Sequence, residues 1–312
     1  NTADALTAPI EEPHRLEGII ERLERVNQPS VTIRVRVTDD DGVEAEMRKV
    51  FYVSPDSDLK PGFPIDMGAS GESSPIMVDL DGDGDLEVVI GTASGVVLAV
   101  QGDGTPVDGW PVSVDARDAV HTESAAYAEG HVDPGTGDSF IGTVAAGDID
   151  GDGEDEVVGA TIFGGIYAWK SDGTRVDGFP YQALGREPEE FDTWHTYDQG
   201  FAGAPTVRDL DGDGAAEIVL PGADGRLYVV SGDGSNWRDY PIEFCFPGSE
   251  YYDYADTMCG FEGDRAISSA LVADVDNDGE FEIGFGTNEA VMDGRFSASY
   301  LIDAKTGEPE PG

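Results

Sequence analysis

The sequence predicts an all-β fold, a β-propeller of four-stranded antiparallel blades, because one pattern of aspartates, glycines and short apolar runs recurs four times. Each copy has a glutamate eight residues after its anchor aspartate; the first three add a glycine at 16, Asp-Gly at 24 and an aromatic-proline pair at 31. One such sheet cannot bury both faces alone, so copies must pack on one another; radial packing gives a propeller, and a solenoid is the alternative. The anchors are Asp79, Asp148, Asp209 and Asp274.

Composition narrows the functional classes. The 312 residues are 39% hydrophobic, which is enough for one large domain or two smaller ones with real cores. Asp and Glu number 64 against 18 Lys and Arg, a net charge of −46, so the surface should repel nucleic acid and anionic lipid and concentrate cations. No apolar run reaches 18 residues, so we expect no membrane insertion. The chain starts at Asn1 without a signal peptide, and we expect it to be processed or part of something longer.

The residues ahead of the repeats do not share the repeat pattern and predict other elements. Residues 13–27 place apolar side chains at amphipathic spacing and predict a short helix. Residues 31–37 and 43–53 flank an Asp-rich turn at 39–42 and predict a β-hairpin. We interpret residues 1–58 as the end of an upstream β-sandwich-like domain plus a linker, and residues 59–312 as the propeller repeats.

Within each repeat, short apolar runs separated by glycine turns predict four strands. Strand one ends at the anchor, an Asp-rich loop leads to strand two, a glycine turn leads to strand three, and Asp-Gly leads to a strand carrying the aromatic-proline. The last repeat stops before that pair, so its blade is predicted to be incomplete. Either further blades or self-assembly complete it, which we favour, or residues 62–65 pair near 300–303 and close the ring. The expected blades are about 61–114, 141–182, 202–243 and 266–312.

The Asp-rich loops predict calcium sites. In the first loop Asp79, Asp81 and Asp83 occupy positions 1, 3 and 5, Gly84 position 6, and Glu87 position 9. Calcium takes about six to eight oxygen ligands, and alternate residues of a tight turn can direct carboxylates at one centre. Position 7 would offer its backbone carbonyl. The candidate ligands are Asp79, Asp81, Asp83, Asp85 and Glu87; Asp148, Asp150, Asp152, Glu154 and Glu156; Asp209, Asp211, Asp213, Ala215 and Glu217; and Asp274, Asp276, Asp278, Glu280 and Glu282.

Three alternatives fit these loops less well than a calcium site does: a metal-free turn, an EF-hand and a magnesium site. Asp and Gly favour turns without any metal, yet four loops in register, each with three or four mutually repelling carboxylates, favour a cation. An EF-hand would place its glutamate at position 12 between two helices. Magnesium prefers rigid octahedral sites that retain water. We therefore expect about four calcium ions.

These loops resemble the FG-GAP or VCBS repeats of integrin α-subunit propellers and of many bacterial secreted proteins, whose loops read Asp-x-Asp-x-Asp-Gly-x-x-Asp. The resemblance covers about residues 61–312, and this chain departs from it with glutamate at position 9 in every copy. It implies a calcium-binding, extracellular propeller used in adhesion. Residues 59–64, leading into 71–75, are also similar to a junction in some bacterial subtilisin-like proteases. This second resemblance implies the alternative interpretation, in which the chain is the non-catalytic region of a larger secreted hydrolase.

The long insertions 115–140, 182–202, 243–266 and 287–299 are predicted on the face opposite the loops. Their aromatic side chains suit recognition of an extracellular protein or glycan, or else pack over the propeller mouth. Their histidines show no catalytic spacing, so we expect no enzyme activity, with a polysaccharide-active propeller as the class to exclude. Two cysteines there can close a 14-residue disulfide loop or remain reduced. The residues concerned are Tyr127, Phe191, Trp194, Tyr197, Tyr251, Tyr252, Tyr254, His121, His131, His195, Cys245 and Cys259.

Overall fold

The computed structural model of the chain divides into two units, Asn1–Phe63 and Pro64–Gly312. The predicted helix at 13–27 and turn at 39–42 lie outside the described residues. The part of the chain that the structure describes contains no helix, so no segment there forms a helix able to cross a membrane. Described are the backbone of 30–38 and 44–52, and all of 60–116, 137–184, 200–243, 266, 268–287 and 299–309.

The first unit contains the predicted β-hairpin. Strands β1 (Ser30–Thr38) and β2 (Glu44–Tyr52) pair antiparallel, with Ser30 opposite Tyr52 and Thr38 opposite Glu44. Alternating Val, Ile and Thr residues favour this extended pairing. The hairpin prediction is therefore confirmed.

The described residues of the larger unit form four antiparallel sheets, each with its strands in chain order. Three sheets have four strands, and the fourth has three strands in its described residues, so the predicted all-β fold of four-stranded blades is confirmed. The strands are β3 (Ile76–Val78), β4 (Glu87–Gly91), β5 (Val96–Val100) and β6 (Val112–Ser113); β7 (Ala145–Gly147), β8 (Glu156–Ala160), β9 (Gly165–Trp169) and β10 (Tyr181–Gln182); β11 (Thr206–Arg208), β12 (Glu217–Pro221), β13 (Arg226–Val230) and β14 (Ile242–Glu243); and β15 (Leu271–Ala273), β16 (Glu282–Gly286) and β17 (Ser299–Asp303).

The fourth strands begin later than the sequence predicted. β6, β10 and β14 each start immediately after the proline of the aromatic-proline pair, which the sequence had placed within the strand. Proline has no N–H to donate to the ladder, so pairing starts one residue beyond it. Residues 62–65 belong to no strand in the described part of the chain, although Phe63 N donates to Lys60 O at 3.1 Å, as Trp110 N does to Val107 O at 3.0 Å.

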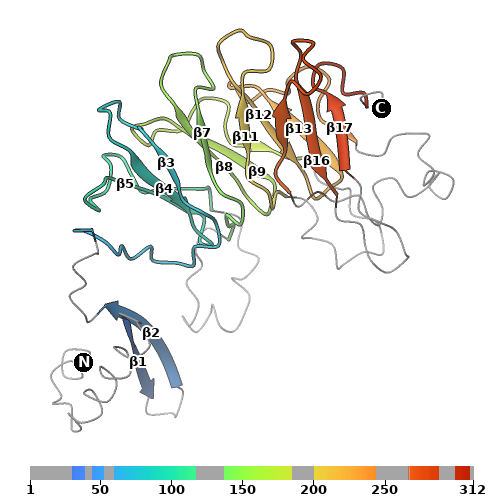
Figure 1. Cartoon of the computed structure of the whole chain (residues 1–312). Coiled ribbons are helices and arrows are strands. Elements are labelled where there is room, and N and C mark those ends of the chain that lie inside the picture. Colours follow the sequence, from blue (N-terminus) through green and yellow to red (C-terminus); the bar gives the residue numbers. More distant parts are fainter. Residues whose placement is uncertain are drawn as a thin grey trace, which may run out of the picture. The chain divides into compact units, whose positions relative to one another are not determined.

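The sheets of this unit follow one another side by side (Figure 1). An apolar core lies between each sheet and the next. Val89 of the first sheet and Trp169 of the second share one core, and Ile218 of the third packs with the second. Ile283 of the fourth sheet packs with the third. The first strands β7 and β11, and β11 and β15, lie side by side, which is the radial arrangement of a β-propeller.

A second contact joins neighbouring sheets at their outer strands. The Gly109-Trp110 pair before β6 lies against the Asp172-Gly173 turn of the next sheet, where the Trp110 indole donates to the Ser171 carbonyl at 2.9 Å. A Cβ added to Gly109 would lie 1.8 Å from the Asp172 carbonyl oxygen, so only glycine fits. We call this contact the outer lock.

The outer lock recurs between the second and third sheets. A Cβ on Gly178, which precedes Phe179, would lie 1.9 Å from the carbonyl oxygen of Asp233 in the third sheet. The aromatic residue that follows the glycine is buried in both locks. The recurring Gly-aromatic-Pro and Asp-Gly signals of the repeat therefore meet across the blade boundary.

The ends of the long insertions lie beside the turns between second and third strands. Asp115 N donates to the Tyr167 hydroxyl at 3.3 Å where one insertion starts, and Phe140 N donates to Thr92 O at 3.1 Å where it ends. Leu184 N donates likewise to the Tyr228 hydroxyl at 3.2 Å. These turns are at the opposite end of the strands from the Asp-rich loops. The predicted recognition aromatics, the histidines and both cysteines lie outside the described residues.

Candidate metal centres

The Asp-rich loops share one backbone conformation. Position 4 has φ between 66° and 79° and position 6 has φ between 91° and 99° in all four loops. Position 4 is Gly82, Gly151, Gly212 or Asn277, and asparagine is among the few side chains that tolerate this left-handed conformation. The two reversals fold each loop tightly enough to gather the alternate carboxylates.

Hydrogen bonds within each loop hold the aspartates in place. The carboxylate at position 1 accepts from the glycine N–H at position 6, at 2.9 to 3.1 Å. The carboxylate at position 5 accepts from the N–H of position 7, at 2.8 to 2.9 Å. At position 5 the loop backbone donates to one carboxylate oxygen. At position 1 it donates to both oxygens in the second, third and fourth loops, and to Oδ2 alone in the first.

The glutamate at position 9 starts the second strand and is buried. Its side chain accepts from the N–H of position 2, at 2.6 to 3.0 Å in the four loops. The pKa of Glu156 and of Glu217 is raised to about 7, chiefly by burial and also by nearby aspartates, although the backbone hydrogen bond acts to lower it. Burial likewise raises the pKa of Glu87. Without a cation, these carboxylates resist ionisation.

Each loop brings three carboxylates together. One oxygen from each member lies within 4.8 Å of the others in all four groups, so every loop has an acidic cluster that could hold a metal ion. Two unit charges about 4 Å apart repel by about 4 kcal/mol at an effective dielectric constant of 20. The clusters are Asp79, Asp81 and Glu87; Asp148, Asp150 and Glu156; Asp209, Asp211 and Asp213; and Asp274, Asp276 and Glu282.

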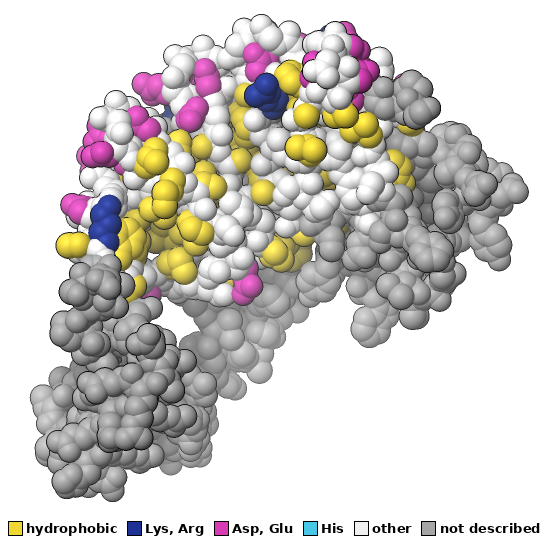
Figure 2. Space-filling model, in the orientation of Figure 1, with side chains coloured by type: hydrophobic (Ala, Val, Ile, Leu, Met, Phe, Trp, Pro, Cys, Tyr) yellow, Lys and Arg dark blue, Asp and Glu magenta, His cyan; other side chains and the backbone are white. Residues whose placement is uncertain are grey.

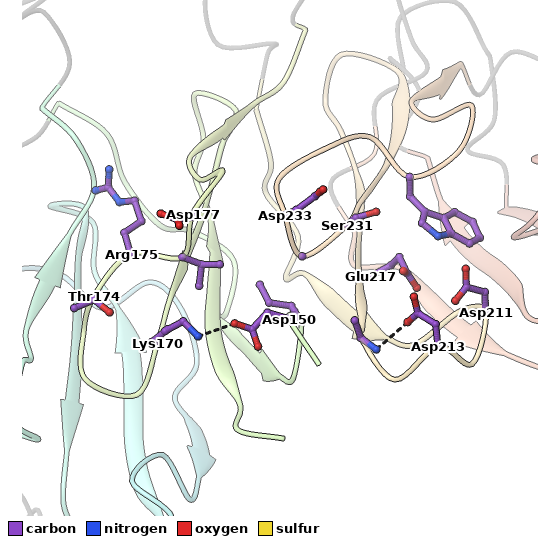
Figure 3. A pocket seen from close by; sticks show the side chains of 15 residues that line it. Asp150, Lys170, Thr174, Arg175, Asp177, Asp211, Asp213, Glu217, Ser231 and Asp233 are labelled. Carbon is purple, nitrogen blue, oxygen red and sulfur yellow. Dashed lines mark hydrogen bonds and ion pairs between the residues drawn. The ribbon is translucent and has the colours of Figure 1, made fainter. Parts of the chain in front are cut away.

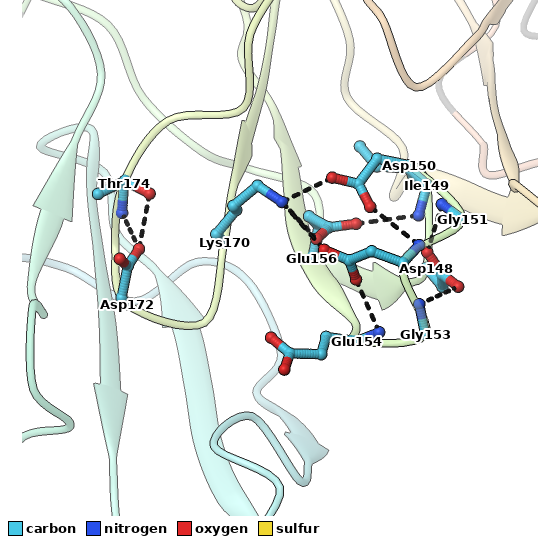
Figure 4. A network of polar contacts seen from close by, with 11 residues as sticks. Asp148, Ile149, Asp150, Gly151, Gly153, Glu154, Glu156, Lys170, Asp172 and Thr174 are labelled. Atoms are coloured by element: carbon cyan, nitrogen blue, oxygen red, sulfur yellow. Dashed lines mark hydrogen bonds and ion pairs between the residues drawn. The ribbon is translucent and has the colours of Figure 1, made fainter.

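The remaining candidate ligands lie at the margin of these clusters. The position 5 aspartate joins the cluster only in the third loop, where it takes the place of Glu217. At position 7, the side chain of Glu280 pairs with Lys305 at 2.6 Å, and that of Glu154 points away from the loop in Figure 4. Asp85 and Ala215 donate their backbone N–H to position 5.

The first loop tests directly whether these residues fit a cation. Asp79 Oδ1 is buried and lacks any hydrogen-bond partner, while Asp79 Oδ2 accepts from Gly84 N at 3.1 Å. A buried carboxylate oxygen without a partner is costly. Its neighbours within 4.8 Å are other carboxylates, from Asp81 and Glu87. A cation at this point would satisfy the oxygen, and the all-oxygen donor set suits a hard divalent ion.

The second loop contains a positive charge of its own (Figure 4). Lys170 Nζ lies 2.6 Å from Asp150 Oδ2, 3.2 Å from Asp152 Oδ2 and 3.9 Å from Glu156 Oε1. The hydrogen bonds to Asp150 and Asp152 raise the pKa of Lys170. The ammonium therefore reaches positions 3, 5 and 9 of one loop at once.

A cleft of about 790 Å³ separates the second and third loops (Figure 3). Asp150 and Lys170 line one wall, and Asp211, Asp213 and Glu217 line the other. Asp and Glu side chains also gather along this rim of the sheets in Figure 2. The rim is thus an acidic surface into which the candidate centres open.

Sequence reasoning missed two features of these loops. The positive φ at position 4 has a signal in the sequence, since Gly, Gly, Gly and Asn occupy it. Lys170 also has a signal, because it is a basic residue at a position that Gln101, Ser231 and Asp303 occupy in the other repeats.

Comparisons with known proteins add the following. No protein-family model matches the chain, and no curated protein matches it. Solved structures with β-propeller-type folds include BBS1N in complex with ARL6DN (14% identity, TM-score 0.44), BamB from Moraxella catarrhalis (16%, 0.41) and the quinohemoprotein alcohol dehydrogenase from Comamonas testosteroni (12%, 0.41). In the same order, the matches cover 78%, 78% and 72% of this chain. They cover 57%, 50% and 33% of the length of the matched structures.

Proposed function

We propose that this chain is a calcium-binding β-propeller module of a secreted or cell-surface protein, structural and non-catalytic. One observation carries the proposal: four loops each gather three carboxylates, and in the first loop a buried Asp79 oxygen lacks a partner. Calcium prefers oxygen donors and tolerates irregular geometry, whereas magnesium retains several waters in a rigid octahedron. The aspartates at positions 1 and 3 would hold the ion in every loop, and its charge would relieve their repulsion.

Calcium binding is expected to stabilise the folded chain strongly. An ion that binds only the folded state adds RT ln(1 + [L]/Kd), about 2.7 kcal/mol per site at a hundredfold excess over Kd. Melting of metal-stripped protein, with calcium or with magnesium added, measures this effect by calorimetry. We expect calcium to raise Tm by many degrees and magnesium to raise it less. An identical Tm with and without calcium would rule out calcium as the ligand.

The proposed role in recognition rests on the arrangement of the insertions. Their described ends lie beside the turns opposite the metal loops, so a partner could bind without contacting the ions. Loops on a rigid scaffold commonly form recognition surfaces. We propose an extracellular protein or glycan as the partner, with the non-catalytic region of a larger secreted hydrolase as the alternative setting. Incubating the protein with acidic polysaccharides and measuring their chain length separates this role from that of a polysaccharide-active enzyme. We expect the chain length to stay unchanged.

A further inference from the structure

The four candidate centres differ in the residue that follows the third strand. In each repeat, the backbone carbonyl of this residue accepts a hydrogen bond from the glycine N–H of the turn, at 2.8 to 2.9 Å. The equivalent residues are therefore Gln101, Lys170, Ser231 and Asp303. Each of their backbone N–H groups also donates across the same turn, at 2.8 to 3.0 Å. The backbone at this position is therefore held alike in every repeat, but only the second repeat puts a cation there.

We propose that Lys170 is a built-in competitor for the metal, which makes the second loop the weakest of the four calcium sites. The inference rests on the proposed calcium function and deepens it. Lys170 Nζ lies 2.6 Å from Asp150 Oδ2 and 3.2 Å from Asp152 Oδ2, so a divalent ion must displace the ammonium from oxygens that it would itself use. The side chain is 38% exposed, which leaves it room to move out into the cleft.

In the other three loops, the nearby side-chain nitrogens make fewer contacts with loop carboxylates than Lys170 does. In the first loop the neutral Gln101 Nε2 lies 3.5 Å from Asp81 Oδ2. In the third, Arg238 Nη2 lies 3.8 Å from Asp211 Oδ2, and in the fourth, Lys305 bonds Glu280 at position 7. An ammonium that bonds two loop carboxylates and lies 3.9 Å from a third is thus found in the second loop. The four sites should fill in two steps as calcium rises.

Calcium titration of the metal-stripped full chain by isothermal calorimetry tests this. We expect three tighter sites and one at least tenfold weaker, and the weak one should disappear in Asp150→Asn. Lys170→Gln, which installs the residue that the first repeat has at this position, should tighten the weak site about tenfold. Lys170→Met should do the same, and serves if the glutamine variant folds poorly.

Arg175→Met is the matched control, because Arg175 lines the same cleft and pairs with Asp115 rather than with loop carboxylates. It removes the same charge and should leave the weak site unchanged. Equal affinity at all four sites, or an equal response to Arg175→Met and Lys170→Gln, would overturn the role of Lys170 while leaving the calcium function standing. If the chain binds no calcium at all, the proposed function fails and this inference fails with it.

Discussion

At the scale of single residues, the glutamate at loop position 9 has a structural role beside the ligand role proposed for it. It is 1 to 4% exposed in all four loops, and its carboxylate accepts the N–H of position 2. Glutamate is longer than aspartate by one methylene, which lets a residue at the start of the second strand reach back across the loop. A shorter residue there would leave the N–H of position 2 without this partner.

These buried glutamates make the metal-free protein sensitive to pH. Glu156 and Glu217 have folded-state pKa values of about 7, against an ordinary value of 4.5. A raised folded-state pKa gives stability that is fully present below about pH 4.5 and is lost as the pH rises through 7. Metal-stripped protein should therefore have a Tm that falls between pH 5 and 7.5 and then levels off.

Calcium should reverse this dependence, because the ion binds the ionised carboxylate and its stabilising effect grows over the same pH range. Calorimetric melting curves with and without calcium measure both slopes. Glu217→Gln keeps the side-chain volume and cannot ionise, so it should make the metal-free slope shallower and leave the part that Glu156 contributes. A metal-free Tm that does not change over this range contradicts the assignment.

At the scale of elements, the outer lock is the contact that glycine alone permits. Gly178 has φ of +93°, and a Cβ there would lie 1.9 Å from the Asp233 carbonyl oxygen of the next sheet. Gly178→Ala should therefore cost roughly 3 kcal/mol, combining a left-handed backbone penalty with overpacking. Urea unfolding of the calcium-loaded protein measures this loss.

Gly68→Ala is the control for the backbone term alone. Gly68 has φ of +73°, and an added Cβ would meet no atom within 4 Å. This variant should cost only about 1 to 2 kcal/mol. Equal losses in the two variants would show that the carbonyl contact across the blade boundary contributes nothing.

Most elements could be predicted because their signals are local. Asp-Gly turns, glycine turns and alternating apolar residues identified the hairpin and the strands of all four repeats. The start of β6 after Pro111 was also readable in principle, since a missing N–H excludes proline from the ladder. The outer lock was not, because Gly109 and Asp172 are joined only by the packing of neighbouring sheets.

The sequence predicted which loops form the candidate metal centres, but not which carboxylates come together in each loop. Spacing identifies which residues share a loop, yet side-chain rotamers decide which oxygens converge. Thus Asp213 joins the third cluster and Asp83 stays out of the first. Lys170 escaped notice because its approach to Asp150 depends on the pairing of β8 with β9.

At the scale of the whole molecule, charge opposes folding. The net charge is −46, and four calcium ions would reduce it to −38 (−46 + 8). Self-repulsion of this size destabilises a compact chain, and salt screens it over a Debye length of about 10 Å at 0.1 M. Raising sodium chloride from 0.05 to 0.5 M should therefore raise Tm in both forms, and more in the metal-free form.

Thermal melting at several salt concentrations measures this effect. We expect most of the increase in Tm below 0.2 M, where screening changes fastest. The calcium-loaded protein provides the internal comparison, since its loop charges are already neutralised. A Tm that falls with salt in the metal-free form would show that attractive ion pairs outweigh the repulsion.

The outer lock also bears on how such a chain could lengthen over evolutionary time. The second repeat contributes the turn half of one lock and the glycine-aromatic half of the other, so it meets both of its neighbours through the same pair of surfaces. A gene segment encoding a repeat of this kind would bring both halves with it. Tandem duplication, or recombination between repeats, would then produce adjoining blades that fit at once, leaving the insertions free to diverge.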